Sequence, residues 1–156
     1  MNRALLTTAL IALLNSTVTF ADPASGLLGA TAARDTALVA RLLAHGADVD
    51  TTDSYGSTPL MIAAACDYAD VAAILVDSGA DVNAVGRIGN TALIHAAQTG
   101  AIEVARLLVA AGALVDVDND YGNTALGLAA GYGHRHIVGI IEAAPEPGAG
   151  PLALAF

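Results

Sequence analysis

The side chains best suited to calcium binding lie together in residues 116–120, where three aspartates and one asparagine precede Gly122. Aspartate oxygens are typical calcium ligands, but a calcium loop also needs glycine at its sixth position and a bidentate acid at its twelfth. Counted from Asp116, these two positions hold Tyr121 and Gly127. We therefore interpret the acidic residues as turn residues, whose side chains accept hydrogen bonds from backbone amides.

Histidine pairs can also bind metal, and His134 and His136 are two residues apart. A stable site needs three or four ligands, and no acid or thiol at ligand spacing joins this pair. His45 precedes Gly46 at an expected helix end, where histidine is favourable for the helix dipole. His95 falls inside an expected helix, as a packing or partly exposed residue. We therefore expect no metal ion and no cofactor.

Cys66 is the only cysteine, so an internal disulfide is impossible. Its thiol could pair with another chain or be buried. Serine, histidine and aspartate are all present, but no nucleophile-elbow or protease motif surrounds them. We therefore expect a chain that is not an enzyme.

A segment that repeats every 33 residues predicts the elements that hold these side chains. It returns as Gly56-Ser57-Thr58-Pro59-Leu60, Gly89-Asn90-Thr91-Ala92-Leu93 and Gly122-Asn123-Thr124-Ala125-Leu126. Three copies at one fixed period predict structural units that stack on their neighbours. Stacked units present an extended surface.

The sequence of each repeat predicts two helices followed by a hairpin. Thr58 is suited to cap the first helix, and Pro59 to occupy its first position. The second helix has apolar residues at helical spacing and is expected to end in a left-handed glycine, Gly79 in one copy and Gly112 in the next. A hairpin rich in Asp, Asn and Gly follows. The break between the helices is expected at Asp67, Gly100 or Gly133.

This combination resembles the ankyrin repeat, whose consensus begins close to G-x-T-P-L-H-x-A-A. Residues 56–84 have the sequence GSTPLMIAAACDYADVAAILVDSGADVNA, and residues 89–117 have GNTALIHAAQTGAIEVARLLVAAGALVDV. The consensus histidine is replaced by Met61, Ile94 and Gly127. The resemblance implies an all-α ankyrin-repeat solenoid of about four helix-turn-helix repeats joined by short β-hairpin loops.

The repeat phase divides the chain into segments. A weaker first copy lacks the Thr-Pro-Leu start, as expected of an N-terminal capping repeat. The ankyrin-repeat domain is expected over residues 22–144, with repeats at about 22–52, 53–85, 86–118 and 119–144. Residues 145–156 are a Pro/Gly-rich linker and an apolar tail, which we expect to fold back on the last helix or dock into a partner.

Residues 1–21 have the layout of a secretory signal peptide. Arg3 provides a positive start, residues 4–14 are an apolar run, and small residues precede a cut after Ala21. An uncleaved anchor is the alternative, but the run is short for a bilayer span. We therefore expect a periplasmic or secreted protein, with no membrane insertion after cleavage.

The chain is acidic, with a formal net charge of −9 at pH 7 from 15 acidic and 6 basic residues. Nucleic acid and anionic lipid both need a positive surface, so neither is expected as a partner. The natural complement is another protein with a basic surface. The length fits one domain, which we expect to be monomeric.

In ankyrin-repeat proteins, partners usually contact the hairpin tips and the exposed part of the first helices. The resemblance implies the same contacts here, at Ser54, Tyr55, Ser57, Cys66, Arg87, Ile88, Asn90, Gln98, Thr99, Asp120, Tyr121, Asn123 and Tyr132. Tyrosine and arginine are enriched in interface hot spots, which favours those members of the set. The alternative is that Tyr55 and Tyr121 only stabilise their hairpins.

The resemblance therefore implies a non-enzymatic protein–protein interaction module. The chain looks like the small exported bacterial ankyrin-repeat proteins, some of which support a stress-response enzyme such as catalase in the periplasm. A secreted effector that binds a host protein is an alternative. A small hydrolase or metal-dependent enzyme on a repeat scaffold is a less favoured one, because fold alone does not fix function.

Overall fold

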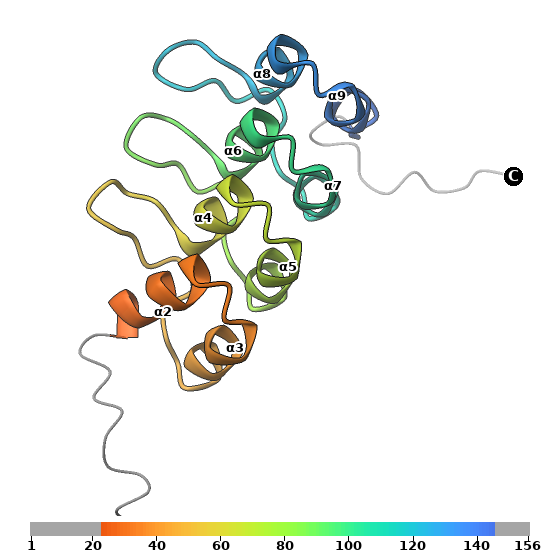
Figure 1. Cartoon of the computed structure of the whole chain (residues 1–156). Coiled ribbons are helices and arrows are strands. Elements are labelled where there is room, and N and C mark those ends of the chain that lie inside the picture. Colours follow the sequence, from red (N-terminus) through yellow and green to blue (C-terminus); the bar gives the residue numbers. More distant parts are fainter. Residues whose placement is uncertain (1–22, 146–156) are drawn as a thin grey trace, which may run out of the picture.

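The computed structural model describes residues 23–145, with side-chain burial described from Gly26 onward. These residues form eight helices in four pairs (Figure 1). The first helices are α2 (Pro23–Ala32), α4 (Pro59–Ala65), α6 (Ala92–Thr99) and α8 (Ala125–Tyr132). The second helices are α3 (Thr36–Ala44), α5 (Ala69–Asp77), α7 (Ile102–Ala110) and α9 (Arg135–Glu142). The expected signal peptide and the expected tail beyond Pro145 lie outside the described residues.

Threonine caps start the first helices where the repeat predicts them. The Oγ1 atom of Thr58 accepts a hydrogen bond from the backbone N–H of Met61 at 3.3 Å, and Pro59 follows the cap. Thr91 and Thr124 cap α6 and α8 in the same way. Each cap satisfies one of the free N–H groups at a helix start, so the three helices begin in the same phase.

The turn between the two helices of each pair places one residue in the left-handed region. Arg34, Asp67, Gly100 and Gly133 have φ angles of 54°, 56°, 80° and 79°. The second helices are followed by left-handed glycines, namely Gly46, Gly79 and Gly112. The predicted breaks and the predicted glycine caps are therefore both confirmed.

Stacking along the chain buries one continuous core. The first helices pack on one another in chain order, and the second helices form a parallel row beside them (Figure 1). Ala63-Ala64 and Ala96-Ala97 are fully buried, and such small side chains let neighbouring first helices approach closely. Val71, Leu75, Val104 and Leu108 from the second helices complete this core. The prediction of an all-α repeat solenoid is confirmed.

The connections between repeats are tight loops that project from one side of the stack (Figure 1). Within residues 23–145 they contain no strand, and one isolated bridge pairs Asp118 with Thr124. Backbone hydrogen bonds close the loops, from Asp53 to Ser57 at 3.1 Å, from Gly86 to Asn90 at 2.9 Å and from Asn119 to Asn123 at 3.0 Å. The expected hairpins are therefore present as turns rather than as paired strands.

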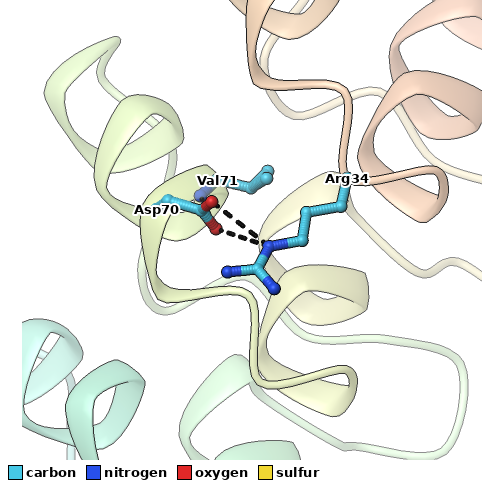
Figure 2. Close-up of polar contacts among 3 residues, drawn as sticks. All are labelled: Arg34, Asp70 and Val71. Atoms are coloured by element: carbon cyan, nitrogen blue, oxygen red, sulfur yellow. Dashed lines mark hydrogen bonds and ion pairs between the residues drawn. The ribbon is translucent and has the colours of Figure 1, made fainter.

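An ion pair joins the first two repeats (Figure 2). The Nε atom of Arg34 lies 3.2 Å from each carboxylate oxygen of Asp70, and the guanidinium lies 5.2 Å from the ring centroid of Tyr68. Burial is the largest single influence on the pKa of Asp70 and raises it. The hydrogen bond from the Val71 N–H, together with the hydrogen bond and the positive charge of Arg34, lowers that pKa by more, so it falls below its ordinary value. Because the pair is exposed, we expect it to orient the two repeats and add little stability.

The last helix, α9, is more amphipathic than its apolar sequence suggests. Ile137 and Ile141 are buried against α7 and α8. Its exposed positions are Arg135, His136, Gly139 and Glu142. This mostly polar outer side is what the last helix of a stack requires.

Candidate protein-binding surface

The residues predicted to contact a partner are mostly accessible. Ser57 and Gln98 are half-buried, Asn90 is buried, and the other predicted contact residues are exposed. They belong to two kinds of segment, loops and first helices, that recur along the stack (Figure 1). One set occupies the loop tips, and the other occupies the C-terminal ends of α4, α6 and α8.

Three of the residues on the loop tips have large, mainly apolar side chains. Tyr55, Ile88 and Tyr121 are spaced 33 residues apart and are 70%, 43% and 73% exposed. Hydrogen bonds between the loops hold these tips together: the Arg87 N–H donates to the Tyr55 C=O at 3.2 Å, and the Asp120 N–H donates to the Ile88 C=O at 3.1 Å. A contiguous exposed apolar row on a folded protein is a typical interaction surface.

Side chains within two of the loops fix their shape. The Oδ1 atom of Asp53 accepts hydrogen bonds from the N–H groups of Tyr55 and Ser57, both at 2.8 Å. Asn119 holds the third loop in the same way. Backbone amides of these loops are therefore satisfied by Asp53 and Asn119, and the side chains of Tyr55 and Tyr121 remain exposed.

A small cavity of about 150 Å³ lies between the first two tips. It is lined by Tyr55, Ser57, Met61, Gly86, Arg87, Ile88, Asn90 and His95. Small-molecule pockets usually have volumes of roughly 300–1,000 Å³, so this cavity is better suited to a single side chain of a partner. The structure thus brings together several of the predicted contact residues in one hollow.

Met61 and His95 line this cavity although sequence reasoning did not place them in the site. Both belong to first helices rather than to the loop tips. The only signal at Met61 was its departure from the consensus histidine, and nothing in the repeat pattern marks the position of His95 as part of a hollow.

The cavity has mostly apolar walls and one positively charged lining residue, Arg87. Arg87 has no ion-pair partner within residues 23–145, whereas Arg34 and Arg106 pair with acids. Burial lowers the pKa of His95 below its ordinary value of 6.5, so this imidazole is neutral at pH 7. Such a hollow suits an apolar side chain that has a carboxylate close beside it.

Asn90 differs from the rest of the predicted set because it holds two loops together. Its Oδ1 atom accepts a hydrogen bond from Nδ2 of Asn119 at 2.7 Å, and both side chains are buried. Loss of either partner would leave a buried polar group unsatisfied. The primary role of Asn90 is therefore structural. The same residue also forms part of the cavity wall.

The set at the helix ends also has structural contacts. The Oγ1 atom of Thr99 lies 3.1 Å from the C=O of His95 in its own helix and 3.3 Å from the C=O of Ala64 in α4, so its single proton is shared between these acceptors. Nε2 of His134 lies 3.3 Å from the C=O of Gln98, so this histidine links the last repeat to α6. Tyr132 is 62% exposed and stacks on His134 with ring centroids 6.2 Å apart. Of these residues, Tyr132 offers the largest free apolar surface.

The described part of the chain has no arrangement suited to metal binding or membrane insertion. No three His, Cys, Asp or Glu side chains within residues 23–145 are grouped so that they could hold a metal ion. None of the helices found there has the length and apolar character needed to cross a bilayer. Cys66 is exposed at the end of α4, so of its two expected states the structure shows the accessible one.

Comparison with known families matches this architecture over most of the chain. A family model described as ankyrin repeats (many copies) matches residues 42–93, and another described as ankyrin repeats (3 copies) matches residues 84–146. No curated protein matches the chain.

Proposed function

The chain belongs to the ankyrin-repeat family, and on this premise we propose that it binds a partner protein through its loop tips and the ends of its first helices. Members of this family generally act as protein-interaction modules without enzymatic activity. The observation that supports this site best is the row of exposed apolar tips beside the cavity that Arg87 borders. The tips supply the aromatic anchors and the cavity supplies a recess for a partner side chain.

The partner is expected to have a basic surface that surrounds a smaller apolar contact. The chain is strongly acidic overall, so long-range attraction favours a positively charged protein. At short range, the apolar cavity and the Arg87 charge favour an apolar side chain near a carboxylate. Long-range attraction mainly sets the association rate, whereas the buried contact mainly sets the dissociation rate.

We place this interaction outside the cytoplasm, as a further part of the proposal. Its support is the signal-peptide layout of residues 1–21, which would leave a chain that starts at Asp22. We propose that this chain acts as a monomer. The resemblance to small exported bacterial ankyrin-repeat proteins makes a periplasmic stress-response enzyme, such as catalase, the first partner to test.

The test is capture of a partner by the chain from Asp22 onward, which contains every described residue. The extract is the periplasmic fraction of the source organism. The binding-surface variant combines Tyr55→Ala, Arg87→Ala, Tyr121→Ala and Tyr132→Ala. The control combines Arg41→Ala, Glu103→Ala, Arg106→Ala and Glu142→Ala, all exposed on the second helices.

A protein retained by the wild type and by the control, but lost with the binding-surface variant, is the expected result. Equal retention by all three chains would contradict the proposed site. Retention only from a host-cell extract would support the effector alternative instead. Catalytic turnover that survives the binding-surface substitutions but is lost with His95→Ala or His134→Ala would support an enzyme.

A further inference from the structure

The last repeat leaves open to solvent several positions that the preceding repeats bury. Leu60 and Leu93 are 1% and 0% exposed, whereas Leu126, in the same phase, is only half-buried. The in-phase threonines and alanines behave alike: Thr58, Thr91, Ala64 and Ala97 are buried, Thr124 is half-buried and Ala130 is exposed. No further repeat follows in the described residues to cover this end of the stack.

A groove occupies this open end. It has a volume of about 370 Å³ and runs between the start of α8 and the end of α9. Its walls are Val115, Asp116, Thr124, Leu126, Ile141, Glu142, Ala144 and Pro145. The apolar part of the wall comes mainly from Val115, Leu126 and Ile141, so an apolar segment would gain free energy by covering it.

In the earlier repeats, the segment that follows the second helix supplies apolar side chains to the core. Ala80 and Ala113 are buried, and Val82 and Val115 pack against the core two residues later. The corresponding positions after α9 are Glu146 and Gly148. Neither residue can supply the missing apolar side chain, so the usual means of filling this space is absent from the last repeat.

We propose that residues 152–156 of the same chain, Leu-Ala-Leu-Ala-Phe, bind in this groove and close the end of the stack. Leu152, Leu154 and Phe156 alternate with alanine, so an extended segment would place all three on one side. The terminal cap that a repeat stack requires would then come from a short tail instead of a full repeat.

The position of the linker supports binding within one chain. Pro145 is itself part of the groove wall, so the chain leaves the described structure at the site it would have to reach again. The six residues from 146 to 151 can span roughly 20 Å, which is ample for a return into the groove. They include two prolines and two glycines, which suit a turn.

A single tryptophan provides a direct test, because the chain has none. In the chain from Asp22, Phe156→Trp is expected to show blue-shifted emission and several-fold weaker acrylamide quenching than a free peptide of residues 146–156 with the same substitution. In the chain that carries Phe156→Trp, Leu126→Asp should return the emission wavelength and the acrylamide quenching to those of the free peptide. The matched control, Ile88→Asp, puts the same charge on a loop tip and should leave the signal unchanged.

A second pair of variants leaves the described structure untouched, in case Leu126→Asp does not fold. Leu152→Ser with Leu154→Ser should release the tryptophan, whereas Ala153→Ser with Ala155→Ser should not. Quenching equal to that of the free peptide in the parent chain would overturn the proposal. Protection that disappears on dilution would also overturn it, because the segment would then occupy the groove of a second copy.

Discussion

At the scale of single residues, the position within the repeat decides backbone conformation more than residue type does. Positions 34, 67, 100 and 133 share a left-handed backbone, although only the last two are glycine. The break at Asp67 could be predicted because its in-phase partners are glycines. The conformation of Arg34 could not, because the first copy lacks the clear motifs that set the phase elsewhere.

Asp67→Gly is expected to stabilise the protein. A side chain in the left-handed region costs about 1–2 kcal/mol, while glycine loses about 0.5–1 kcal/mol through its greater freedom in the unfolded chain. The net gain in the free energy of unfolding should be about 0.5–1 kcal/mol, measured by urea denaturation. Asp67→Ala retains the Cβ atom and serves as the control. An equal gain for Asp67→Ala would show that relief of backbone strain is not the cause.

His95 should make stability depend on pH. Burial holds its folded-state pKa below the unfolded value of 6.5, so the unfolded chain takes up protons first as pH falls. The contribution is fully present above pH 6.5 and is lost as pH falls through the folded-state pKa. Urea denaturation between pH 7.5 and pH 5 should show this loss in the wild type and in the exposed control His136→Gln, and a smaller loss in His95→Gln. The same slope in all three chains would contradict the assignment.

At the scale of elements, neighbouring loops are in direct contact at their tips, so a change in one loop affects the next. A Cβ atom on Gly89 would lie 2.8 Å from both Asn119 Cα and Asp120 N, with φ at 76°. Gly122 has a similar φ of 73° but has open space around it. The two glycines occupy the same place in the repeat motif, yet one of them also sets the distance between neighbouring loops.

Gly89→Ala should therefore destabilise the protein more than Gly122→Ala. Both substitutions add a side chain in the left-handed region, at about 1–2 kcal/mol. Gly89→Ala also forces the third loop away, which should cost about 1–3 kcal/mol more. Urea denaturation of the two variants gives the difference directly. Equal losses would mean that the loops are not in close contact.

The elements themselves could be predicted from the sequence, but the contacts between loops could not. Threonine caps, glycine ends and the 33-residue period follow local rules, and all were confirmed. The Asn90–Asn119 pair and the hollow beside His95 depend on how far one repeat is displaced from the next. That displacement is set by packing between repeats, which a single repeat motif does not encode.

At the scale of the whole molecule, the chain has a formal net charge of −9, and the predicted contact residues lie on the loop tips and at the ends of the first helices. The period predicted the stacking and therefore the alignment of the tips in a row. The cavity and the groove at the last repeat were not predictable, because each depends on which positions the neighbouring repeats leave uncovered.

The proposed partner-binding surface consists of the loop tips and the ends of the first helices. Its most direct test is hydrogen exchange of the chain from Asp22, alone and bound to the captured partner. In the bound chain we expect slower exchange in residues 53–58, 86–91 and 119–124 and at the C-terminal ends of α4, α6 and α8, with α3, α5 and α7 unchanged. Protection confined to the second helices, with the loops unaffected, would contradict the proposed surface.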